Sequence, residues 1–135
     1  MVSMEQNNSH EAALRRWFDA WLTADEAAAA PLFAQDAVYS ECWGPQYRGR
    51  AQILRWFADW NRDGRVLEWR IRRLWQQGDT VIAEWFFRCV KGCERAAFDG
   101  VTIAEFDAAG RIAALREFES KAEHVFPYGE DADPA

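Results

Sequence analysis

The sequence has few of the residues that build metal sites, disulfide frameworks or membrane spans. Its 135 residues include three cysteines and two histidines, and their spacing matches no zinc pattern. It lacks a run of roughly 18 uncharged apolar residues, and no basic segment precedes an apolar one at its start. A formal net charge of −6 argues against a nucleic acid partner. We therefore expect a cytoplasmic protein with free thiols and neither a metal nor a membrane partner.

Aromatic residues, in contrast, are abundant. Eight Trp and nine Phe suggest a wide apolar cavity, a dimer face or both, because aromatic side chains supply much of the area buried in cores and interfaces. The length fits one domain over 1–135, with an ordered core at about 9–122. The acidic tail, 123–135, is expected to end in disorder, with Val125, Phe126 and Tyr128 as candidates to fold back.

The hydrophobic spacing changes from helical to alternating along the chain. The first half predicts helices over 9–23, with Ser9 as the N-cap, over 25–33 and over 50–61, and a strand over 38–43. The second half predicts strands over 66–75, 80–90, 96–107 and 111–120. This order indicates an α+β fold, with three helices packed on one face of a curved antiparallel sheet.

Several segments in this order resemble a known superfamily. An N-terminal helix, PLFAQDAVYSE, YRGRAQILRWF and a closing FDAAGRIAALREF resemble the nuclear-transport-factor-2-like superfamily in its SnoaL-like branch, over nearly the whole chain. The resemblance implies a cone-like α+β barrel, with an antiparallel or mixed sheet, around a pocket for a small apolar or aromatic molecule. It leaves the activity open, because this fold carries isomerases, epoxide hydrolases, polyketide cyclases, dehydratases and binding domains.

A distant resemblance to ketosteroid isomerase implies three catalytic positions. The general base falls at Glu41, and the two oxyanion donors fall at Trp17 and Thr102, whose indole and hydroxyl are weaker donors than a phenol or a carboxylic acid. Losing one such donor costs about 3 to 4 kcal/mol, which disfavours steroid isomerisation. Glu41 has two interpretations: a carboxyl in the cavity, with a pKa raised by desolvation, or a carboxylate at a strand end, solvated or paired with Arg48 or Arg50.

The same resemblance implies a pocket lining. One group of positions could equally belong to ordinary core: Trp21, Phe33, Trp56, Phe106 and Leu115. A second group lies on the strands: Val66, Glu68, Glu84, Phe86, Arg88 and Glu117. Arg88 with Glu84 or Glu117 would anchor a polar group of the ligand.

The strands over 66–75 and 80–90 have two unlike faces. The plain interpretation turns the apolar face inward and leaves the Glu and Arg side chains in water. The resemblance favours the reverse, in which the charged face lines the cavity and the apolar face is covered by a second subunit. We favour this second interpretation, which predicts a homodimer through Trp69, Ile71, Trp85 and Phe87.

Together these patterns favour a cofactor-free enzyme of isomerase, cyclase, hydratase or hydrolase type, with Glu41 as general base or acid. The alternative is a non-catalytic ligand-binding or dimerisation module, whose Glu and Arg groups saturate one another. A protein-transport adaptor is a third option. We expect a structural role for Cys89 and Cys93, and the sequence assigns none to His10 or His124.

Overall fold

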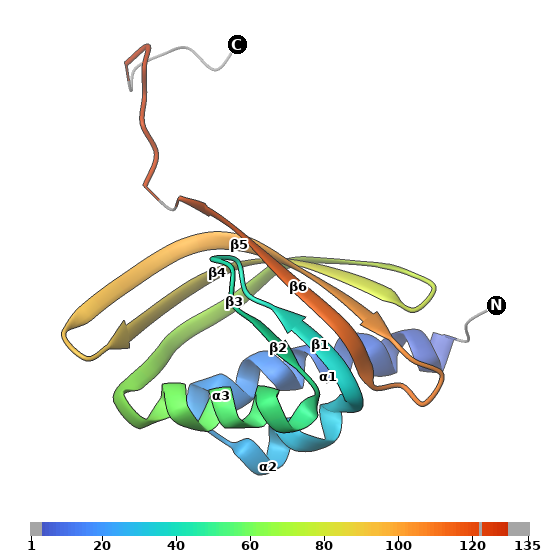
Figure 1. Cartoon of the computed structure of the whole chain (residues 1–135). Coiled ribbons are helices and arrows are strands. Elements are labelled where there is room, and N and C mark those ends of the chain that lie inside the picture. Colours follow the sequence, from blue (N-terminus) through green and yellow to red (C-terminus); the bar gives the residue numbers. More distant parts are fainter. Residues whose placement is uncertain (1–3, 122, 130–135) are drawn as a thin grey trace.

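The computed structural model describes residues 4–121 and 123–129 and has the expected α+β architecture, with helices gathered on one side of a curved sheet (Figure 1). The helices are α1 (Met4–Thr23), α2 (Glu26–Ala29), the short 3-10 helix η1 (Ala30–Leu32) and α3 (Arg50–Asp63). The strands are β1 (Phe33–Ser40), β2 (Gln46–Arg48), β3 (Gly64–Gln77), β4 (Thr80–Lys91), β5 (Glu94–Phe106) and β6 (Ile112–Lys121).

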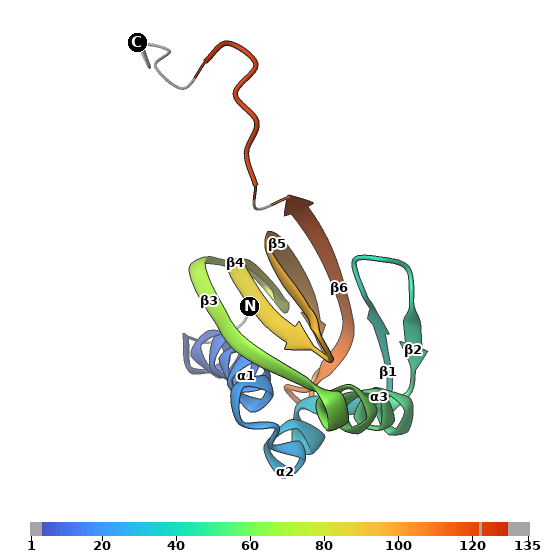
Figure 2. The ribbon, with the colours of Figure 1, turned by 90° about the vertical axis from the view of Figure 1, so that its left-hand side faces the viewer.

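The sheet is mixed and open. Its strand order is β2-β1-β6-β5-β4-β3, with β1 parallel to β6 and the other neighbours antiparallel. The four long strands curl around the helices, and β2 and β3 form the two edges (Figure 2). The expected cone-like arrangement of helices and curved sheet is therefore confirmed, as an unclosed cone.

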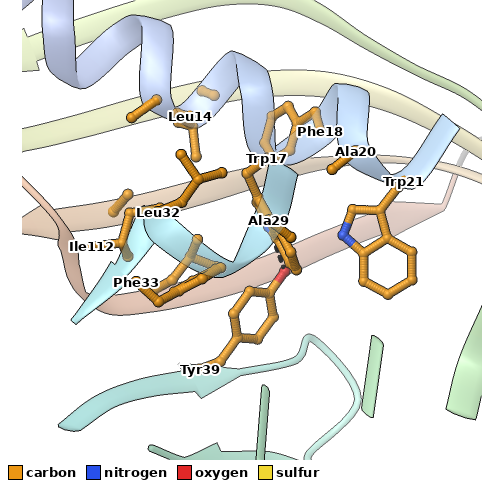
Figure 3. Packing of buried hydrophobic residues seen from close by; sticks show 14 of the residues in the cluster. Leu14, Trp17, Phe18, Ala20, Trp21, Ala29, Leu32, Phe33, Tyr39 and Ile112 are labelled. Atoms are coloured by element: carbon orange, nitrogen blue, oxygen red, sulfur yellow. Dashed lines mark hydrogen bonds between the residues drawn. The ribbon is translucent and has the colours of Figure 1, made fainter. Parts of the chain in front are cut away.

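Helix α1 supplies the centre of the core. Leu14, Trp17, Phe18 and Trp21 recur at helical spacing and are buried under the sheet (Figure 3). Burying each such side chain stabilises the fold by about 1.5–3 kcal/mol. The helix begins at Met4, so Ser9 lies inside it, and the prediction that Ser9 is the N-cap is wrong.

The helix expected over 25–33 is shorter than predicted. Asp25 caps α2 by accepting a hydrogen bond from the Ala28 amide at 3.1 Å, but the α-helix ends at Ala29 because Pro31 follows within the next turn. Strand β1 consequently starts at Phe33, earlier than predicted, and ends at Ser40. Strand β2 was not predicted, because it has only three residues; it pairs with the end of β1.

The apolar face of the sheet is the inner face, so the interpretation that we favoured is wrong. Trp69, Trp85 and Phe87 are buried, and Ile71 packs against the core. Trp69 stacks on Phe18 of α1 with ring centroids 4.2 Å apart, because the apolar stripe of α1 needs an apolar surface to cover it. These four residues therefore do not form an outer dimer face.

The charged side chains lie on the opposite, outer face. Ion pairs join Arg72 to Asp99 at 2.6 Å, Arg88 to Glu68 at 3.6 Å and Arg73 to Glu84 at 3.8 Å. The pairs are partly exposed, so each adds only about 0–1 kcal/mol to stability. The predicted polar anchor of Glu84 and Arg88 is thus outside the cone.

A local irregularity and a glycine shape the inner face. Val66 pairs with Cys89 and Glu68 with Arg88, so Leu67 is an extra residue, and this bulge turns both Val66 and Trp69 inward. A Cβ at Gly100 would lie 2.3 Å from the Trp85 ring and 2.6 Å from the Phe118 carbonyl oxygen. Only glycine leaves room there for the indole ring.

The described part of the tail leads away from the sheet (Figure 1). Val125, Phe126 and Tyr128 are 81%, 55% and 93% exposed, so the suggestion that they fold back is wrong for 123–129. Residues 130–135, where we expect disorder, lie outside the described residues. Within the described residues, no helix is long and apolar enough to cross a membrane.

Candidate functional site

A cavity of about 500 Å³ lies between the inner face of the sheet, α3, the β1–β2 turn and the β4–β5 hairpin. Its aromatic lining comprises Trp21, Tyr39, Trp43, Tyr47, Trp56, Trp60, Trp69, Trp85, Phe87 and Phe98. Two carboxyl groups, on Glu41 and Glu117, share this apolar space. Apolar walls with a few convergent polar groups are typical of small-molecule sites.

The Glu117 carboxyl ends a chain of hydrogen bonds that starts in the core. Trp17 Nε1 donates to the Tyr39 hydroxyl at 3.3 Å, and this hydroxyl donates to Glu117 Oε2 at 2.5 Å. The parallel pairing of β1 with β6 sets Tyr39 opposite Leu115 and so brings the phenol to the carboxyl group. Figure 3 shows the Trp17–Tyr39 bond beneath α1.

Glu117 is suited to hold a proton at neutral pH. Burial raises its pKa to about 8, the charge of Glu41 adds to the increase, and the hydrogen bond from Tyr39 opposes it. Since Tyr39 occupies Oε2 as a donor, the proton of the neutral acid belongs on Oε1. Burial and Glu117 also raise the pKa of Tyr39 well above its usual value, which keeps the phenol a donor.

Glu41 lies in the turn after β1 rather than on a strand. Its backbone amide donates to the Pro45 carbonyl oxygen at 2.9 Å, and the Tyr47 hydroxyl donates to its Oε2 at 2.8 Å. Burial raises the pKa of Glu41, while hydrogen bonds from Tyr47 and Trp43 and the charge of Lys91 oppose this increase. The first interpretation of Glu41, a desolvated carboxyl in the cavity, fits this geometry.

The expected arginine partners of Glu41 bond elsewhere. Arg48 Nε donates to Gln46 at 3.1 Å, and Arg50 donates to the Phe33 carbonyl oxygen at 3.3 Å. Glu41 and Glu117 therefore differ in environment: Glu41 has a donor and a nearby cation, whereas Glu117 is more strongly desolvated. Two carboxyls whose pKa values are separated in this way are the arrangement expected for a base and an acid.

The other predicted site residues divide into three groups. Trp21, Trp56 and Val66 line the cavity, as the resemblance implied. A second group is buried in the core and outside the cavity lining: Trp17, Phe33, Thr102, Phe106 and Leu115. Thr102 accepts a hydrogen bond from Trp85 Nε1 at 2.8 Å, so its hydroxyl holds the indole in place rather than facing a ligand.

The third group lies on the outer face of the sheet. It consists of Glu68, Glu84, Arg88 and Phe86. The Arg70 and Arg72 guanidinium groups each lie 5.8 Å from the centroid of the Phe86 ring. Their assignment to the pocket is wrong because the apolar sheet face turns inward. The saturated Glu and Arg network expected of a binding module is thus absent from the described cavity lining.

Sequence reasoning missed both phenols of the site. Tyr39 precedes Glu41 by two residues, and strand alternation would have placed it on the same face as Glu41. Tyr47 carried no such signal, because β2 is too short for a pattern. Ring stacking of Tyr47 on Trp56, with centroids 4.5 Å apart, fixes the phenol that bonds Glu41.

Two of the three cysteines, Cys42 and Cys89, line the cavity. Cys42, Cys89 and Cys93 are free thiols, and burial raises the pKa of Cys42 to about 12, with Glu119 adding to the increase. In residues 4–121 and 123–129 no three His, Cys, Asp or Glu side chains are placed to hold a metal ion.

Several solved structures have the same fold as this chain. An LEH-like epoxide hydrolase from Mycobacterium tuberculosis is 20% identical, with a TM-score of 0.76 over 84% of each chain. A Catenulispora acidiphila protein with a ketosteroid isomerase-like fold, in complex with trimethylamine, is 23% identical, with a TM-score of 0.70 over 78% of this chain and 83% of its own. An NTF-2 like protein of unknown function from Burkholderia xenovorans is 18% identical, with a TM-score of 0.72 over 91% of each chain.

These likenesses establish the fold alone, since the identities are low. Proteins of curated function give no match. The profile of the SnoaL-like domain matches residues 14–115, which span α1 to the middle of β6 and include Glu41 but not Glu117. The chain therefore belongs to the SnoaL-like domain family.

Proposed function

We propose that this protein is a cofactor-free acid/base enzyme that acts on a small, largely apolar molecule in the cavity, with Glu41 as the general base. Glu117 supplies the complementary acid. The proposal depends chiefly on one observation: two carboxyls in one aromatic cavity, of which one is strongly desolvated and bonded by Tyr39, while the other is bonded by Tyr47 near Lys91.

The two groups divide the proton transfers between them. Glu41 removes a proton from a carbon atom or from water, and Glu117 donates its Oε1 proton to the oxygen on which negative charge develops. For an isomerisation, Glu41 then returns its proton to a second carbon and Glu117 regains its own, so that both groups are restored. A positioned acid or base typically increases the reaction rate about 10²–10⁴-fold. The apolar walls of the cavity strengthen the electrostatic stabilisation of the transition state.

A Glu41→Gln variant tests this assignment. A panel covering epoxide opening, enone isomerisation and intramolecular cyclisation first identifies a turned-over compound. The variant should then lose about 100-fold or more in kcat/KM while its urea unfolding stays cooperative. Glu84→Gln is the matched control, because Glu84 is a half-exposed carboxylate on the outer face, and it should keep full activity.

The pH profile adds a second criterion. Activity requires ionised Glu41 and protonated Glu117. We therefore expect kcat/KM to decrease at low pH, where Glu41 becomes protonated, and also above about pH 8, where Glu117 loses its proton. Activity that survives Glu41→Gln would refute the assignment of the base.

Non-catalytic ligand binding is the second candidate. The Catenulispora acidiphila neighbour is in complex with trimethylamine, so a protein of this fold can hold a small ligand. Binding without turnover across the reaction panel, unaffected by Glu41→Gln, would favour this candidate. A cytoplasmic location and a homodimer stay predictions. The surface predicted for the dimer faces the core, and the mass of the protein in solution tests whether a dimer forms.

A further inference from the structure

We propose that the cavity selects a substituted ammonium ion, a cation carrying hydrocarbon groups, over a neutral molecule of the same shape. This inference deepens the proposed function, since it rests on the cavity being a small-molecule site. It names the substrate class from the rings and charges of the lining.

The lining is rich in rings of the kind that attract cations. The face of an indole or phenol ring carries negative electrostatic potential, and Trp attracts cations most strongly among the aromatic side chains. Trp21, Trp56 and Trp60 meet at the α3 side of the cavity, with the Trp21 centroid 5.1 Å from Trp56 and 5.4 Å from Trp60. Trp69 and Trp85 continue this wall along the sheet, with centroids 5.5 Å apart.

One cation of the chain already uses this wall. The Lys91 ammonium lies 5.7 Å from the centroid of the Trp60 ring. Lys91 is exposed at the end of β4, so the contact is made at the mouth of the cavity. A ring that holds an ammonium at the mouth can hold one inside, where less water competes with it.

Charge is distributed so that the interior is acidic. Glu41 and Glu117 lie within the lining and are half-buried, whereas the two cations of the described lining, Lys91 and Arg95, are exposed at the β4–β5 hairpin. Asp59 and Glu94, also exposed, add two acidic groups to the rim. A cation inside the cavity therefore faces carboxyl groups and rings, and the repelling charges are at the rim.

The test compares choline with 3,3-dimethylbutan-1-ol, which differ in a central nitrogen or carbon atom and therefore in charge. Titration calorimetry on the full chain gives the affinity for each probe. We expect choline to bind about tenfold or more tightly than the alcohol. Glu41→Gln should weaken the binding of choline but not that of the alcohol.

Glu84→Gln, on the outer face, is the control and should change neither affinity. Equal affinities for the two probes, or no detectable binding of choline, would overturn the selection for a cation. The proposed function would still hold after either outcome if Glu41→Gln abolishes the turnover of a neutral substrate. Selection for choline combined with full turnover in Glu41→Gln would keep this inference and refute the catalytic assignment.

Discussion

Replacing Glu117 with Gln should make the stability of the protein much less dependent on pH. Glutamine keeps the shape of the neutral acid, and its side-chain oxygen accepts the hydrogen bond from Tyr39. The substitution therefore removes the ionisation of this carboxyl and little else. Its effect on the free energy of unfolding reports directly on how strongly the cavity desolvates Glu117.

The size and sign of the effect follow from the pKa values. Glu117 has a pKa of about 8 in the folded chain, against 4.5 for an unperturbed group. Between these values the folded state holds a proton that the unfolded state has released, so stability falls as pH rises. A difference of about 3.5 at about 1.4 kcal/mol per pH unit amounts to about 5 kcal/mol, lost progressively and complete above about pH 8.

Urea unfolding followed by tryptophan fluorescence at pH 6, 7, 8 and 9 measures this loss. Relative to Glu117→Gln, the free energy of unfolding of the parent chain should decrease by roughly 1.4 kcal/mol per pH unit up to about pH 8. Other groups titrate in both proteins, so their contributions cancel in the difference between the two curves. Parallel curves for the parent chain and Glu117→Gln would refute the desolvation of this carboxyl.

Glu41→Gln tests whether the two carboxyls of the cavity interact electrostatically. Removing the Glu41 charge lowers the pKa of Glu117, because that charge is one of the causes that raise it. The decline in stability of Glu41→Gln should therefore end at a lower pH than in the parent chain. An unchanged or higher end point would contradict the electrostatic coupling of the two carboxyls.

Two further substitutions test the inner face of the sheet. Gly100→Ala should destabilise the fold by about 1–3 kcal/mol in urea unfolding, because its Cβ would lie 2.3 Å from the Trp85 ring; a change below the error of the measurement would show that the ring moves freely. Thr102→Val should lower the free energy of unfolding by about 1–3 kcal/mol, because the Trp85 indole N–H loses its acceptor. Thr102→Ser keeps the hydroxyl and should lower it less. Equal losses in the two variants would refute the hydrogen bond as the cause.

The long strands could be predicted from the sequence because each carries many β-branched and aromatic residues between clear turn signals. The pattern predicts a strand over 80–90, and β4 spans Thr80–Lys91. The face that turns inward could not be predicted in the same way, since alternation defines two faces without saying which one the helices cover. The bulge at Leu67 made this harder, because it puts Val66 and Trp69 on one face although they are an odd number of residues apart.

The candidate site was predicted only in part for a related reason. Glu41 was found from the resemblance and lies in the cavity, but its partner Tyr47 is on a strand of three residues. Glu117 was expected as a polar anchor beside Arg88, and its actual partner is Tyr39. The parallel register of β1 on β6 creates this contact, and a register between distant strands leaves no local mark in the sequence.

That register also has a consequence for the order of folding. The hydrogen bond from Tyr39 to Glu117 joins residues 78 positions apart in the chain. Among the described strands, β6 is the last to leave the ribosome. Until β6 is added, β1 and β5 each lack their neighbour on one side. A shortened or emerging chain therefore exposes two sheet edges that can pair with other chains. The insertion of β6 covers both edges and completes the Tyr39–Glu117 hydrogen bond in the same step.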